Sequence, residues 1–164
     1  MSLVDALLPE FDHEMTTTRV YLERVPEDQW GWTPHAKSMS LGTLATHIAT
    51  IPMWGHVTLT QPDFDVAGPS PAPATSRAEI LRMFDAHVAA ARVALVGKTD
   101  AELAAPWALT RGTQIIFSMP KASVWRSFVM SHLVHHRAQL GVYLRMHDIA
   151  VPATYGPSAD ERAF

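Results

Sequence analysis

Apolar side chains recur at helical spacing in four stretches of the chain, covering residues 3–25, 40–59, 76–97 and 121–146. In the first stretch, the apolar face is formed by Phe11, Met15, Thr18, Leu22 and Val25. Ser40 and Ser76 stand where the second and third helices need an N-cap, and Gly97 stands where the third should stop. Four amphipathic segments predict an all-α fold, namely an antiparallel four-helix bundle that occupies residues 1–164 as a single domain.

Proline and glycine mark the breaks in this pattern. Between the second and third helices we expect a long connector over residues 61–75, because it contains Pro62, Pro69, Pro71 and Pro73. Residues 106–119 have the weakest helical pattern, and Arg111-Gly112 is compatible with the turn of a small hairpin between residues 107–109 and 115–117. Pro9 should bend the first helix or mark its start, and Pro52 should bend the second.

Composition narrows the class of protein further. The chain has no cysteine, which excludes disulfides, cysteine-ligated metals and a cysteine nucleophile. Its net charge is −3 with no basic run, which argues against a broad nucleic-acid surface. No apolar run approaches the ~18 residues of a membrane span, and the N-terminal residues lack the pattern of a secretory signal. We therefore expect a cytoplasmic protein that binds neither nucleic acid nor a membrane.

Histidine is the residue type that suggests chemistry, because the chain has nine. His132 and His136 lie one turn apart on one face of the fourth helix, so both rings can reach one ion at ~2.0–2.1 Å. His135 is a rival ligand. A histidine pair alone is often only a solvated helix face, but His47 lies on the apolar stripe of the second helix. Three histidines from two helices, with a coordination position left open, are typical of a catalytic metal site.

Other side chains share the faces of these histidines. Trp54 lies two turns beyond His47, and Gln139 and Tyr143 continue the stripe of the fourth helix. We predict a pocket beside the metal that is lined by Trp54, His135, Gln139 and Tyr143. No protein nucleophile is evident, and the unranked candidates for acid–base roles are Glu14, Glu161 and Tyr143.

Several motifs, taken in order, resemble the DinB/YfiT-like family of metal-dependent enzymes over nearly the whole chain. They are Phe11-Asp12-His13-Glu14, Trp30-Gly31-Trp32-Thr33-Pro34, Leu44-Ala45-Thr46-His47-Ile48-Ala49, His132-Leu133-Val134-His135-His136-Arg137-Ala138-Gln139 and Tyr155-Gly156-Pro157. Two positions depart from the family pattern. Ser131 stands where members often have Asn or Asp, and Ala138 stands where many have Gly. Ser131 leaves open which group orients His132.

The resemblance implies a four-helix bundle with a metal site formed by His47, His132 and His136, which makes His135 a neighbour of the site. It implies a divalent transition metal, for which Zn, Ni and Fe are the candidates. It also implies an enzyme of the thiol S-transferase type, in which the ion activates a low-molecular-weight thiol or water for attack on a small electrophile. A metal-dependent hydrolase and a non-catalytic metal-binding stress-response protein are the alternatives. Bundles of this kind are frequently homodimers, so we expect one here.

Overall fold

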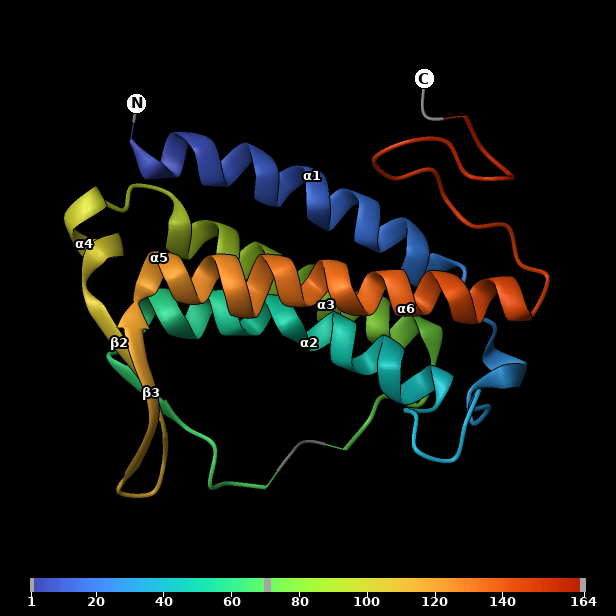
Figure 1. Ribbon diagram of the computed structural model, residues 1–164, viewed down its shortest axis with the longest axis horizontal. Coiled ribbons are helices and arrows are strands. Elements are labelled where there is room, and N and C mark those ends of the chain that lie inside the picture. Colours follow the sequence, from blue (N-terminus) through green and yellow to red (C-terminus); the bar gives the residue numbers. More distant parts are fainter. Residues whose placement is uncertain (1, 70–71, 163–164) are drawn as a thin grey trace.

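Four long helical segments run side by side and form the body of the structure, a computed structural model that describes residues 2–69 and 72–162 (Figure 1). They are α1 (Leu3–Glu23), α2 (Leu41–Thr60), α3 (Arg77–Leu95) and a composite helix made of α5 (Lys121–Val124), the π-helical η2 (Trp125–Ser131) and α6 (His132–Met146). Two short helices, η1 (Glu27–Gln29) and α4 (Asp100–Ala104), lie in the connections. The four helices predicted from the apolar periodicity are therefore present.

Local sequence signals explain where these helices begin and end. The Ser40 hydroxyl accepts a hydrogen bond from the Thr43 amide at 3.2 Å, and the Ser76 hydroxyl caps α3 in the same way. Gly97 has a φ of +79° just after α3, a conformation that L side chains rarely adopt. α1 begins before Pro9 rather than at it. Both helices that contain a proline, α1 with Pro9 and α2 with Pro52, continue beyond it.

The helices pack around a core in which α2 and α3 make the most extensive contact. The largest fully buried side chains come from all four long segments and include Phe11, Leu44, Ile48, Phe84 and Trp125. α2 approaches η2 closely at Gly55, where an added Cβ would lie 2.8 Å from the Trp125 ring. This close approach fixes the separation of the two segments that carry the predicted histidine ligands.

The prediction of an all-α fold is wrong, because the described residues also form a mixed sheet in the order β1-β2-β3. β1 (Asp63–Asp65) pairs in parallel with β2 (Pro106–Arg111), and β2 pairs antiparallel with β3 (Gln114–Pro120). The hairpin is the one that Arg111-Gly112 suggested, and Gly112 adopts a φ of +58° in its turn. β1 lies in the expected connector, of which Pro71 is outside the described residues.

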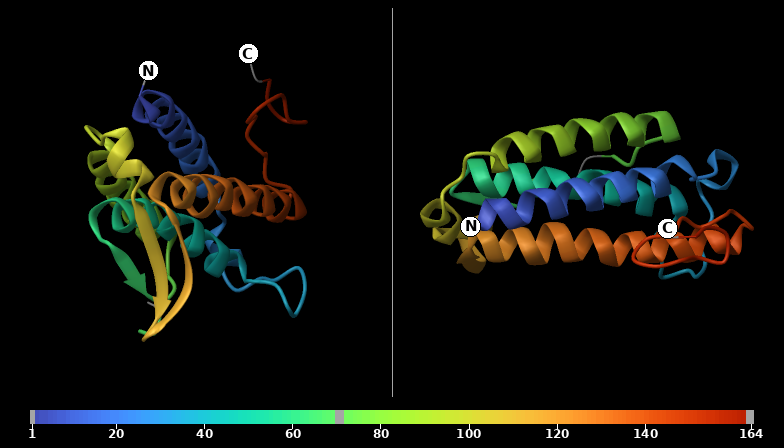
Figure 2. Two further views of the ribbon diagram at one scale, coloured as in Figure 1. Left: turned by 60° about the vertical axis from the view of Figure 1, so that its left-hand side comes forward. Right: turned by 90° about the horizontal axis from the view of Figure 1, so that it is seen from above.

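Packing explains why a sheet forms here. Alternate hairpin residues near the bundle, namely Trp107 and Leu109 in β2 and Phe117 and Met119 in β3, are apolar, and they pack with buried Val57 and Val124 in a satellite core. The sheet thus covers the end of α2 and the start of the composite helix and projects from the bundle beside them (Figure 2). Over the described ranges, no helix has the length and apolar character required to cross a membrane.

Candidate metal centre

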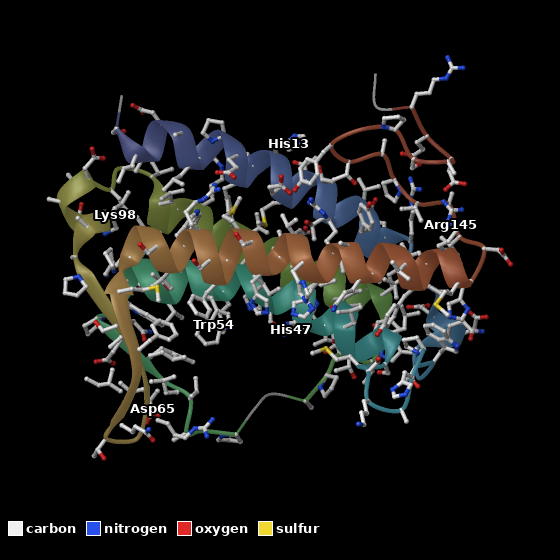
Figure 3. The ribbon with its side chains drawn as sticks, in the orientation of Figure 1. His13, His47, Trp54, Asp65, Lys98 and Arg145 are labelled. Carbon is white, nitrogen blue, oxygen red and sulfur yellow. The ribbon has the colours of Figure 1, made fainter. Side chains whose placement is uncertain are left out.

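Three histidine rings from two helices converge at the seam between α2 and α6. His47 projects from α2 (Figure 3). His132 is the first residue of α6, and His136 lies one turn later. His132 Nε2 lies 3.1 Å from His47 Nε2 and 2.9 Å from His136 Nε2. One ligand atom from each ring lies within 4.8 Å of the others, and all three rings are half-buried. The structure therefore brings together the three residues named from the sequence, which we call the histidine cluster.

The spacing of these nitrogens fits a shared ion. A tetrahedral ion with Zn–N bonds of ~2.0–2.1 Å holds its nitrogen ligands roughly 3.3 Å apart. The two Nε2 separations of 3.1 and 2.9 Å are close to that value. These two pairs would need to open by only a few tenths of an ångström to hold an ion.

Hydrogen bonds outside the cluster set the tautomers of two rings. Gln139 Oε1 lies 2.7 Å from His136 Nδ1 and accepts its proton. Burial lowers the pKa of His132, and the hydrogen bond from its ring to the Phe128 carbonyl opposes that shift. The hydrogen-bonded nitrogen carries the proton and is the one away from the cluster. Both Nε2 atoms then present lone pairs, which repel at 2.9 Å unless a proton or a cation lies between them. The donor set therefore fits a metal ion.

Burial lowers the pKa of all three rings. Desolvation, assisted by the neighbouring rings of His136 and His132, lowers the pKa of His47 to about 4. For His132, desolvation outweighs the carbonyl that raises its pKa, and for His136 it outweighs the bond to Gln139. The rings are consequently neutral at pH 7, which is the form that donates a lone pair to a metal.

The π-helical turn before His132 is a feature that the spacing of the sequence did not reveal. η2 replaces α-helical geometry from Trp125 to Ser131, and His132 follows it directly. Such wide turns are rare and frequently occur at functional sites. Ser131 is exposed. The group that hydrogen-bonds to the His132 ring on the side away from the cluster is the Phe128 carbonyl.

The four residues predicted to line a pocket are distributed around the histidine cluster. Gln139 contacts the cluster directly through His136. His135 is exposed, with its ring centroid 4.8 Å from that of His136, and lies outside the cluster. Tyr143 donates a hydrogen bond to the Met39 carbonyl at 3.2 Å. Trp54 is half-buried and points to the same side of α2 as His47 (Figure 3).

Comparison with known proteins agrees with this arrangement. The sequence model of the DinB family matches residues 1–163. The chain belongs to the DinB family. A crystal structure of a DinB-like protein from Bacillus subtilis aligns with a TM-score of 0.71 at 15% identity, covering 97% of this chain and 99% of that one. A DinB-like protein from Bacillus cereus ATCC 10987 aligns with a TM-score of 0.72 at 23% identity, covering 92% and 97%.

At these identities the likeness to the two solved structures concerns the fold. No curated protein matches the chain. The family assignment and the histidine geometry are therefore the two findings from which a function can be argued.

This DinB-family chain also contains a buried ionic network that the sequence reading missed. The Arg137 side chain is 2% exposed, and its Nη2 lies 2.7 Å from Glu14 Oε2 in α1. Tyr155, from the C-terminal segment, donates to Glu14 Oε1 at 2.9 Å and accepts from Arg137 Nη2 at 2.8 Å. Glu14 is thereby engaged away from the histidines, and Glu161 pairs with Arg24. Neither carboxylate is placed as an acid–base group of the site.

Proposed function

We propose that the chain is a metal-dependent enzyme in which His47, His132 and His136 bind one divalent transition metal, with Zn, Ni and Fe as the candidates. The observation that carries the proposal is the convergence of three imidazoles, with the Nε2 atoms of His47 and His136 both within 3.1 Å of His132 Nε2. Hydrogen bonds on the opposite side of the His136 and His132 rings leave these two Nε2 atoms as lone-pair donors. The half-buried cluster leaves one side accessible for a substrate. A structural site would be closed by a fourth protein ligand, and no other histidine or acidic side chain of the described residues joins the group.

The reaction we propose is attack by a low-molecular-weight thiol, or by water, on a small electrophile. When bound by three neutral imidazoles, a divalent ion retains its positive charge and can lower the pKa of water or stabilise a thiolate. Because the chain has no cysteine, a sulfur nucleophile would have to come from a small thiol. Such thiols are kept reduced inside the cell, so we propose that the protein acts in the cytoplasm.

The chain's own residues would prepare this site before any ligand arrives. Gln139 and the Phe128 carbonyl orient His136 and His132 and hold their protons away from the cluster. Burial keeps His47 neutral. Packing at Gly55 and Trp125 holds the two helices at the separation that the three rings require.

The first experiment is elemental analysis of protein purified without a histidine tag, followed by cobalt substitution. We expect about one ion per chain and a cobalt spectrum that gains a sulfur-to-metal band when a thiol is added. Hydrolysis of esters or amides without added thiol would instead favour a hydrolase. Stoichiometric metal with neither response would favour a non-catalytic metal-binding protein, and absence of metal at pH 7.5 would refute the proposal.

We further propose that the protein is a homodimer. Support comes from the outer face of α6, where Val142 and Met146 are 59% and 55% exposed and border a shallow cavity of about 370 Å³. Large exposed apolar side chains that line one face are typical of a contact surface. Light scattering at micromolar concentration should give twice the mass of the 18.1 kDa chain, and a monomer mass would contradict the proposal.

A further inference from the structure

Four aromatic side chains from four different elements gather beside the histidine cluster. They are Trp54 of α2, Phe64 of β1, Phe117 of β3 and Phe128 of η2, and we call them the aromatic wall. The Trp54 and Phe64 rings meet edge to face with centroids 5.3 Å apart. The Phe117 and Phe128 rings are stacked with centroids 4.7 Å apart. The sheet supplies two of the four rings, Phe64 from the unpredicted β1 and Phe117 from the hairpin that Arg111-Gly112 suggested.

Two residues of the aromatic wall lie on the same helical segments as the histidines, Phe128 before His132 and Trp54 after His47. Phe128 lies one helical turn before His132, and its carbonyl is the group that hydrogen-bonds to that ring. Trp54 lies two turns after His47, about 10 Å along the axis of α2, and both side chains project to the same side (Figure 3). By position along their helices, Phe128 and Trp54 thus lie about one and two turns from a histidine of the cluster.

Burial distinguishes this wall from ordinary core. Its four side chains are half-buried, in contrast to Trp107 and Trp125, which are 1% and 0% exposed. The wall packs on the satellite core of Val57, Trp107 and Val124. On the other side of the histidines, Gln139 and Tyr143 present polar groups. The site thus has one apolar flank and one polar flank.

We propose that the aromatic wall binds a flat apolar group of the substrate, with Trp54 as the specificity-determining residue. The inference rests on the proposed function and specifies its substrate class, namely small electrophiles or thiols that carry an aromatic or other planar unsaturated group. Aromatic side chains favour such groups because ring–ring contacts add to the effect of apolar burial. The reacting atom would lie at the histidine cluster and the planar group one to two helical turns away.

Binding of three hydroxamates to the zinc-loaded protein tests this proposal without an activity assay. Acetohydroxamate has a metal-binding head and no ring, benzohydroxamate places a ring next to the head, and 3-phenylpropionohydroxamate places it further away. We expect 3-phenylpropionohydroxamate to bind at least roughly tenfold more tightly than acetohydroxamate, on the scale of burying one phenyl ring. The measurement is calorimetric titration at pH 7.5.

Variants at Trp54 test whether the aromatic wall causes this difference in hydroxamate affinity. In Trp54→Ala and Trp54→Leu the ratio of the two affinities should fall several-fold while acetohydroxamate affinity and zinc content stay unchanged, and Trp54→Phe should restore most of the ratio. Trp32→Ala is the matched control, because Trp32 packs on Tyr143 at the polar flank with a centroid distance of 5.4 Å. It should leave the ratio unchanged.

The possible failures are distinguishable. Equal affinities for the ringed and ringless probes, or a ratio lost in Trp32→Ala and kept in Trp54→Ala, would overturn the role of the aromatic wall and leave the metal site intact. If zinc does not bind at all, or if no hydroxamate binds to the zinc-loaded protein, the proposed function fails as well. Leu at position 54 keeps apolar volume, so a folding defect confined to Trp54→Ala still leaves a variant that decides the question.

Discussion

Replacing Arg137 with methionine should remove a large share of the protein's stability. The Arg137 guanidinium is 2% exposed and pairs with Glu14, which is itself buried. It also donates to the Glu14 carbonyl at 3.2 Å and to Thr18 Oγ1 at 3.1 Å. Methionine is similar in length but lacks these donors, so Glu14 keeps the Tyr155 hydroxyl as its polar partner and has no opposite charge beside it.

The expected magnitude follows from that loss. Removing one partner of a buried ion pair lowers the free energy of unfolding by about 3–5 kcal/mol, because the remaining charge is left uncompensated in a medium of low polarity. For a chain of this size, that corresponds to a fall in melting temperature of roughly 6–20 °C. The double variant Glu14→Leu with Arg137→Met replaces the pair with apolar groups and should recover at least about 2 kcal/mol relative to Arg137→Met alone.

Urea unfolding followed by circular dichroism, at pH 7.5 in the presence of a chelator, measures these differences. Arg126→Met is the matched control, because its pair with Glu10 is exposed, with side chains 52% and 39% accessible. That variant should lose no more than about 1 kcal/mol. The ion pair does not have the role assigned to it if Arg137→Met loses no more free energy of unfolding than the control. The same conclusion follows if the double variant loses as much as the single variants Arg137→Met and Glu14→Leu together.

Three further predictions concern the histidine cluster. Alanine at His47, His132 or His136 should each abolish stoichiometric metal by elemental analysis, whereas His135→Ala should retain it; the reverse pattern would invalidate the ligand set. Gln139→Leu should weaken zinc binding by about 10–100-fold in a competition titration, because it removes the acceptor that orients His136, and an unchanged affinity would exclude that role. With a chelator present, lowering the pH from about 6.5 to about 4 should lower the melting temperature. In this range the unfolded chain binds a proton at His47, with an ordinary histidine pKa of about 6.5, whereas burial lowers the pKa of folded His47 to about 4. Stability should be constant above that window, and His47→Asn should reduce the slope.

The helices and the pair His132 and His136 could be predicted because their signals are local, whereas His47, 85 residues from His132, was joined to them through its apolar stripe and the family resemblance. Apolar spacing defines each helix, and His132 and His136 are neighbours on one face whatever the rest of the chain does. β1 could not be predicted, because three residues in a proline-rich connector become a strand only through pairing with β2, from Asp63 opposite Ala108 onward. Arg137 and Glu14 are likewise separated by 123 residues, and nothing in the sequence near either residue indicates the other.

The π-helical segment is the part of the fourth helix that a count of residues per turn could not show. Counting at 3.6 residues per turn holds from His132 onward, where α6 is regular. Between Trp125 and Ser131 the helix is wider, although Trp125 and Val129 still face the core and are both 0% exposed. The hydrogen bond from His132 to the Phe128 carbonyl depends on that segment and follows from no residue type.

Apolar packing on both helices should hold the three imidazoles near one another before any ion binds. His47 is flanked in α2 by Leu44 and Ile48, and α6 contributes Leu133 and Leu140, all of them at most 1% exposed. The apolar stripes of the bundle extend well beyond the cluster on both helices. Collecting neutral rings whose lone pairs face one another is unfavourable, and burial of these neighbours offsets that cost in the folded chain. The site is thus preorganised, unlike the sites of small zinc domains, which are unfolded without their metal. Removal of a bound metal should therefore lower the stability of the protein without unfolding the bundle.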